Sequence, residues 1–224
     1  MKQQIYIFEG NQEDGIFSSH KKFYNSEDTE ETIFNKIKEA RIKLGKKHNF
    51  SGLKMFQVTQ KMEDNNLYPD NKAIIIDKSY MQKEDYFKEI IPADIIIISN
   101  NYKGVALAHR MADCPVLIIE DRKKGYAGIV HCGLYHINRG LPKEFIKAMI
   151  NMCNSNPQDL YLYIGSHISK ESYVYDTYPK LATNKNIWKD AIEKKDDGYH
   201  IDLLKAINNQ IEEFDLAEVK VSNI

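Results

Sequence analysis

A cysteine and a histidine stand at matching ends of two neighbouring apolar stretches. Cys114 comes just before residues 116–119, His131 ends the stretch 126–131, and a charged turn that finishes in glycine joins the two. β-branched residues on both sides of such a turn predict a strand-turn-strand hairpin. An in-register hairpin returns the second strand to the end where the first begins, so the thiol and the imidazole would meet there. Together they suit zinc, and either can act as a nucleophile or as an acid or base.

The same pair has a plainer interpretation. A cysteine near a strand end is usually a small core residue. However, Asp113 lies beside Cys114, and His131 leads into a Cys-Gly turn, so polar groups gather at this end of the hairpin without a packing reason. These neighbours favour a chemical site, in which Asp113 would orient a ligand or carry a proton.

The composition argues against a nucleic-acid-binding or membrane protein. With 224 residues and 42% hydrophobic content the chain can bury a substantial core, and a net charge of −1 predicts no broad attraction to nucleic acid or to an anionic membrane. The longest apolar run, residues 95–98, is far shorter than the ~20 residues of a membrane helix. Three irregularly spaced cysteines and no apolar leader favour a cytoplasmic protein whose thiols are free, ligating or catalytic.

The elements that must position the pair alternate between strands and helices. We expect a helix over 28–44 that stops at Gly45, a turn over 134–140, a helix opened by Pro142 with Cys153 in its apolar stripe, and a last helix from Asp202. No repeat or linker interrupts the chain, so we expect one α/β (α+β) domain over 1–224 with mixed β-sheets covered by helices. Besides the hairpin, the expected strands cover 5–9, 53–59, 73–76, 94–99, 104–108 and 160–164.

Two segments in this order resemble the paired signature of the laccase-domain family, also called YfiH-like or multicopper polyphenol oxidoreductase-like proteins. They are Ala112-Asp113-Cys114-Pro115-Val116 and Ile129-Val130-His131-Cys132-Gly133. The resemblance runs from about Asn25 to the C-terminus. The other agreeing segments, in chain order, are Phe56-Gln57-Val58, Ala93-Asp94, Ile164-Gly165-Ser166-His167-Ile168-Ser169-Lys170-Glu171-Ser172-Tyr173 and Ile201-Asp202-Leu203.

This resemblance implies an α/β fold and a site that binds zinc through two histidines and one cysteine. The activities it implies are phosphorolysis of purine nucleosides and deamination of adenosine; an older label for the family is copper-dependent phenol oxidation. Cys114 and His131 match two of the three zinc ligands. The expected partners are then a purine nucleoside and phosphate, with no nucleic acid or membrane, and the expected assembly is a monomer or homodimer.

The third ligand position departs from the family pattern, because Thr59 stands where the family has histidine. His136 and His167 fall in loops that the resemblance places near the site, and either would complete a Cys-His-His zinc set. His109 lies five residues before Cys114. In an extended strand an odd spacing puts two side chains on opposite faces, so we expect His109 to be a poor co-ligand.

The family's Trp-Arg pair is also missing, because Leu134 and Tyr135 follow Gly133. Arginine presents a planar fork of donors that suits phosphate, so Arg110 and Arg139 are the candidate phosphate partners. Tyr135 and Tyr173 are aromatic candidates for stacking a base or a sugar.

Three functions are compatible with these residues. The first is an enzyme that processes purine nucleosides at a Cys/His zinc site. The second is a nucleoside-binding or regulatory protein that has lost catalysis on the same scaffold. The third is a metal-free cysteine hydrolase in which His131 activates Cys114.

Overall fold

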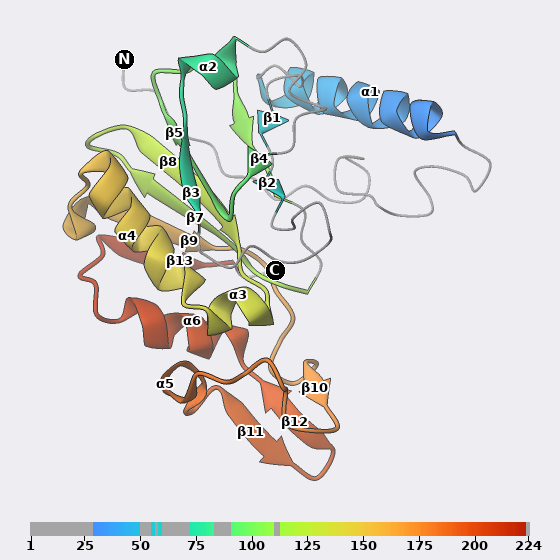
Figure 1. The fold of residues 1–224 in the computed structure, drawn as a ribbon, viewed down its shortest axis with the longest axis vertical. Coiled ribbons are helices and arrows are strands. Elements are labelled where there is room, and N and C mark those ends of the chain that lie inside the picture. Colours follow the sequence, from blue (N-terminus) through green and yellow to red (C-terminus); the bar gives the residue numbers. More distant parts are fainter. Residues whose placement is uncertain are drawn as a thin grey trace.

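A six-stranded mixed sheet forms the centre of the molecule (Figure 1). The structure is a computed structural model that describes residues 29–49, 55–56, 58–59, 72–82, 91–109 and 113–222. The strand order is β13-β9-β7-β8-β5-β3; the two outer pairs, β3 with β5 and β9 with β13, are parallel, and the inner pairs are antiparallel. The strands are β3 (Ala73–Ile76), β5 (Ile95–Ser99), β7 (Val116–Asp121), β8 (Tyr126–His131), β9 (Leu160–Ile164) and β13 (Glu218–Val221).

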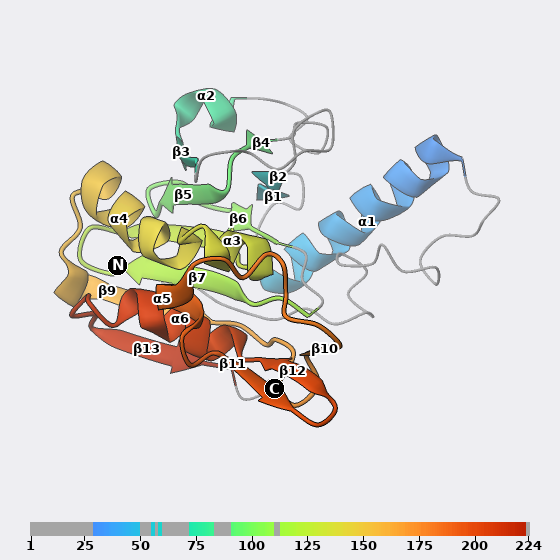
Figure 2. The same ribbon diagram turned by 60° about the horizontal axis from the view of Figure 1, so that its bottom comes forward.

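Strand β5 is buried on both of its faces, as its unbroken apolar run predicts. Ile95 and Ile97 pack into one core with α3 (Leu134–Asn138), α4 (Leu141–Cys153) and α6 (Leu203–Ile211). Ile96 and Ile98 face the opposite way, into a second core with residues of β1 and β4. Figures 1 and 2 show the three helices side by side along one face of the sheet. Successive side chains of β5 point to opposite faces of the sheet and therefore pack into two separate cores.

The remaining elements lie around the sheet, and all of them except the 19-residue helix α1 are short. A small antiparallel sheet has the order β10-β12-β11, and two parallel pairs, β1 with β6 and β2 with β4, lie elsewhere. These elements are α1 (Glu30–His48), β1 (Met55–Phe56), β2 (Val58–Thr59), α2 (Lys78–Met81), β4 (Ile91–Pro92), β6 (Ala106–Leu107), η2 (Pro157–Asp159), β10 (Val174–Tyr175), α5 (Lys185–Trp188), β11 (Ile192–Lys195) and β12 (Gly198–Ile201).

Several expectations need correction. The strand expected over 53–59 is two short strands with different partners, and the strand expected over 5–9 lies outside the described residues. Helix α1 continues past Gly45 to His48, because glycine is tolerated inside a helix at a modest cost, and the left-handed Asn49 (φ 59°) ends it. Residues 134–138 are a helix, not a turn. Among the described helices, none is both long enough and apolar enough to cross a membrane.

A glycine in β8 lets helix α4 approach the sheet closely. A Cβ at Gly128 would lie 2.6 Å from Phe145 Cε2 and 3.2 Å from the carbonyl oxygen of Ile96. The Phe145 ring is fully buried, so it has little room to move away. The close contact between α4 and the sheet thus depends on Gly128. This contact sets the distance between the sheet and the layer of helices that begins with α3.

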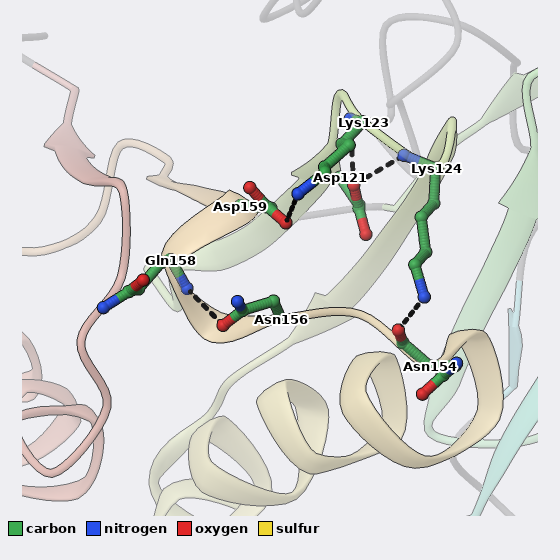
Figure 3. A network of polar contacts seen from close by, with 7 residues as sticks. All are labelled: Asp121, Lys123, Lys124, Asn154, Asn156, Gln158 and Asp159. Atoms are coloured by element: carbon green, nitrogen blue, oxygen red, sulfur yellow. Dashed lines mark hydrogen bonds and ion pairs between the residues drawn. The ribbon is translucent and has the colours of Figure 1, made fainter.

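The turn between β7 and β8 is held by one buried carboxylate (Figure 3). Asp121 Oδ1 accepts the backbone N–H groups of Lys123 at 2.9 Å and Lys124 at 2.8 Å. The Lys124 ammonium donates to the carbonyl oxygen of Asn154 at the end of α4, and the Lys123 ammonium pairs with Asp159 at 3.1 Å. The turn is therefore tied both to itself and to the chain that follows α4.

We predict that Asp121→Ala lowers the free energy of unfolding by about 1–3 kcal/mol, because two backbone N–H groups of the turn lose their acceptor. Lys123→Ala is the matched control, since it removes only an exposed ion pair worth less than about 1 kcal/mol. Urea denaturation followed by circular dichroism measures both. Equal stability of the two variants would contradict the role assigned to Asp121.

Candidate functional site

The register of the hairpin sets the position of the candidate site. Val116 lies directly opposite His131, and the N–H of Cys132 donates to the carbonyl oxygen of Pro115 at 2.8 Å. Strand β9 ends at the same edge, where the N–H of Gly165 donates to the carbonyl oxygen of Val116 at 2.9 Å. The predicted hairpin is confirmed, and Cys114 and His131 both lie at this edge of the sheet.

Three functional side chains converge on Gly133, the residue between β8 and α3. A Cβ built at Gly133 would lie 3.2 Å from Cys114 Sγ, 3.6 Å from His131 Cε1 and 3.6 Å from His136 Nδ1. Any larger residue would press against the sulfur, so glycine leaves room for the group. The structure thus brings together the thiol and the two imidazoles, with His136 supplied by α3 instead of by a loop.

His109 also belongs to this group, which corrects the expectation that it faces away. Its ring stacks on His131 with centroids 5.0 Å apart and an angle of 25° between the planes. His131 in turn makes an edge contact with His136 at 5.7 Å. Strand β6 ends before His109 and β7 begins after Cys114, so the odd spacing between them does not follow the alternation of an extended strand.

Burial favours the uncharged forms of His131, His136 and Cys114. It lowers the pKa of His131, and it lowers the pKa of His136 to about 3, with smaller contributions from the positive charges of His131, Arg139 and His109. Burial raises the pKa of the Cys114 thiol, as does the neighbouring Asp113 carboxylate, while the N–H of Leu134 at the sulfur opposes the change. Near neutral pH His131 and His136 are therefore uncharged and can offer a nitrogen lone pair, and the Cys114 thiol stays protonated unless a cation binds it.

His136 is the most unusual of these side chains. Only 6% of its surface is exposed, and within the described part of the chain neither ring nitrogen has a hydrogen-bond partner. A buried polar group left in this condition costs about 1–3 kcal/mol. Its neighbours are the rings of His131 and, at 5.6 Å, Tyr135. Such a group in a native protein calls for a functional explanation.

The charge of Arg139 acts both on His136 and on a buried carboxylate, Asp94. The Asp94 side chain is fully buried, and its Oδ2 accepts the N–H of Lys72 at 2.9 Å. Burial raises the pKa of Asp94, whereas the Lys72 N–H and the charge of Arg139 lower it. The Arg139 guanidinium lies 5.3 Å from the centre of the Tyr135 ring. Sequence reasoning did not assign Asp94 to the site, although a lone acid within the apolar run 91–98 was a usable signal.

The other predicted residues have varied positions. Asp113 is exposed, and its carbonyl oxygen accepts the N–H of Ile168 at 2.8 Å, which joins the loop after β9 to the site. The His167 Nδ1 lies 2.9 Å from the carbonyl oxygen of Gly165. The Tyr173 hydroxyl pairs with that of Tyr175 at 3.2 Å. Burial and that pairing raise the pKa of Tyr173, and the nearby Cys114 and Asp113 add to it.

Two positions add little to the site. Arg110 lies outside the described residues, and Thr59 lies in β2 opposite Pro92. Within the described ranges, no group of three or more His, Cys, Asp or Glu side chains is arranged so that it could hold a metal ion. The donor types around Gly133 nevertheless fit zinc, and His136 has two nitrogens with no other role. Coordination by this group would therefore require side-chain rotation.

Comparison with known proteins identifies the family. The sequence profile described as "Multi-copper polyphenol oxidoreductase laccase" matches residues 15–224. The chain belongs to this family. Over 79 residues it is 35% identical to "Purine nucleoside phosphorylase YlmD" of Bacillus subtilis (strain 168). That alignment covers 35% of this chain and 28% of the Bacillus protein, so it spans under a third of the relative's length.

Solved structures of laccase-domain relatives share the fold. YfiH of Bacillus licheniformis aligns with a TM-score of 0.68 at 17% identity, over 89% of this chain and 73% of its own. YlmD of Geobacillus stearothermophilus gives 0.70 at 18%, over 85% and 70%. The Neisseria meningitidis protein NMB0706 gives 0.62 at 15%, over 88% and 72%. The expected α/β fold with mixed sheets is confirmed.

We predict that stability falls more steeply with acid in the wild type than in His136→Asn. The unfolded histidine binds a proton near pH 6.5 whereas the folded one does so near pH 3, so the unfolding free energy of the wild type drops as pH falls through this window. The difference in slope is at most about 1.4 kcal/mol per pH unit.

Urea denaturation between pH 7.5 and 5, with a chelator present, measures these slopes. His167→Asn is the control, because its ring is half-exposed and Nδ1 already faces a carbonyl oxygen. Parallel slopes for wild type and His136→Asn would show that His136 does not lose its proton on folding.

Proposed function

We propose that this protein is an enzyme that processes purine nucleosides, by phosphorolysis of adenosine or inosine or by deamination of adenosine. The observation that carries the proposal is the convergence of Cys114, His131 and His136 on Gly133. Membership of the laccase-domain family and the name of the Bacillus subtilis relative support the substrate class. The donor types, a thiol with neutral imidazoles, support acid/base or metal-assisted chemistry at that point.

Each residue has a role that follows from its surroundings. His131, whose pKa is lowered by burial, offers an uncharged imidazole as a ligand. The charges of Cys114 and Asp113 act on the Tyr173 hydroxyl. The Tyr173 ring offers a surface against which a base or a sugar can stack. A zinc ion held by Cys114 and His131 would supply Lewis acidity and a coordinated water of lowered pKa.

Phosphate would be bound by Arg139. Its guanidinium is partly buried beside Tyr135 and exerts its charge on both Asp94 and His136. A guanidinium in partly buried surroundings binds an oxyanion more strongly than one in water, because the local dielectric is lower. Arg139 thereby supplies the cation that Tyr135 does not, where the family carries an arginine close to the site.

The metal-free cysteine hydrolase is less well supported. Burial and the Asp113 charge both raise the pKa of Cys114, which keeps the thiol protonated near neutral pH. A nucleophilic cysteine needs the opposite shift, because the thiolate is the reactive form.

We predict that Cys114→Ala and His131→Ala each reduce turnover of adenosine or inosine at least a hundredfold, because each removes a group at the point of reaction. Cys153→Ala is the control, since this cysteine belongs to the core around α4. The assay follows release of base with phosphate present, and inosine formation from adenosine without it. Turnover retained by both site variants would contradict the proposal, and ligand binding without turnover in the wild type would favour the binding protein.

We predict that Arg139→Lys raises the KM for phosphate tenfold or more with a smaller change in kcat, because lysine keeps the charge but loses the planar fork. Arg122→Lys is the control, since its guanidinium lies 3.9 Å from the Tyr161 ring and pairs with Glu120 at the remote hairpin turn. Initial rates with inosine at varied phosphate measure both. An unchanged phosphate KM in Arg139→Lys would contradict the assignment.

A further inference from the structure

We propose that one edge of the central sheet joins two copies of this chain, by antiparallel pairing of β13 with β13 of a second copy. The inference goes beyond the nucleoside chemistry proposed above, because it concerns an edge strand and not the site around Gly133. It commits to a single register, in which Val219 lies opposite Val219 of the second copy and Glu218 lies opposite Lys220.

The first argument is that β13 has a neighbour on one side only. It comes last in the strand order β13-β9-β7-β8-β5-β3, and Figure 2 shows it at the rim of the sheet. On its inner side it pairs in parallel with β9, and no strand in the described part of the chain flanks its outer side. An edge strand presents a row of backbone N–H and C=O groups with which another strand can pair.

The second argument is which residue directs its backbone groups outward. The N–H of Ser222, directly after β13, donates to the last residue of β9 at 2.8 Å. In a parallel ladder alternate residues of a strand bond to the same neighbour, so Glu218 and Lys220 also direct their backbone groups toward β9. Val219, between them, directs its N–H and C=O outward. The N–H of Ala217, which precedes the strand, bonds to β9 at 3.0 Å and does not enter this outer row.

The third argument is that the charges of this edge are complementary to themselves. When two antiparallel copies of β13 are centred on Val219, residue 218 of each lies opposite residue 220 of the other. Glu218 and Lys220 are both exposed, and they lie on the same face of the strand. The two-fold contact therefore contains two facing pairs of a carboxylate and an ammonium. Unlike charges on facing residues stabilise a strand pair, whereas like charges destabilise it.

The fourth argument is the apolar residue at the centre of the edge. The surface of Val219 is 43% exposed, although its neighbour in β9, Leu162, is buried. Self-pairing would remove part of this apolar surface from water, and the N–H of each Val219 would donate to the carbonyl oxygen of the other. Many edge strands carry lysine, proline or a bulge that discourages pairing. In this register Lys220 does the opposite, because it faces an acid.

The opposite edge of the sheet is the competing contact. It is formed by β3, whose sequence Ala-Ile-Ile-Ile carries no charge that could fix a register. Its last residue, Ile76, is fully buried in the second core and has no side-chain surface to offer. Charge and exposure therefore favour β13.

The test measures the mass of the whole chain in solution. Analytical ultracentrifugation of the wild type from about 1 μM to about 1 mM covers the affinities of a small contact, and we expect the average mass to rise from one chain toward two. Glu218→Lys and Lys220→Glu should each weaken association at least tenfold, because like charges then face each other in both pairs. An equimolar mixture of these two variants should associate again, because in the mixed dimer every charge meets its opposite.

Matched variants keep the test decisive. Val219→Pro should abolish association and leave the chain folded, since proline is tolerated where the N–H of an edge strand faces outward. Glu39→Lys makes the same charge change at an exposed residue of α1, far from β13 in Figure 2, and should associate as the wild type does. Circular dichroism shows whether each variant is folded. A wild type that stays monomeric over the whole range, unchanged association in either charge variant, or a mixture that does not associate would overturn the inference.

Discussion

The register between β7 and β8 is the constraint on which the candidate site depends. Asp121 holds the turn at one end of the hairpin, and the hydrogen bond from Cys132 to Pro115 closes the other. A slip of one residue would turn every side chain of β8 to the opposite face and would separate His131 from Cys114. Gly128 of β8 also matters for packing at this register, because a Cβ there would lie 2.6 Å from the Phe145 ring.

That register also places apolar side chains on one face of the end of β8 and a polar side chain on the other. Val130 and Cys132 are fully buried in the core under α3 and α4, whereas His131, between them, contacts the rings of His109 and His136. The apolar neighbours exclude water from His131 and His136, and this burial lowers the pKa of both imidazoles. The alternation of side chains along the end of β8 therefore both packs the core and lowers the pKa of the buried imidazoles.

Sequence patterns anticipated the parts of the fold that local chemistry controls. The hairpin, the doubly buried β5 and the proline-started α4 follow from β-branched runs and turn residues. The small sheet escaped notice because β11, with the sequence Ile-Glu-Lys-Lys, has no apolar alternation. At the site, the meeting of Cys114 with His131 could be inferred from the hairpin. The contacts of His109 and the position of His136 on a helix could not, because they depend on the course of irregular segments, which the spacing of apolar residues does not reveal.

A shared fold does not by itself determine which side chains stand at this site. Laccase-domain relatives with 15–18% identity retain the architecture, which shows that the sheet and its helices tolerate wide substitution. Chemistry requires particular donors at one point, and a donor can reach that point from any element that borders it. Gly133 is bordered by the start of β7, the end of β8 and α3, so a histidine on α3 reaches the same space without any change in the sheet. The backbone therefore fixes where these side chains meet, and each of the elements around Gly133 can supply one of them.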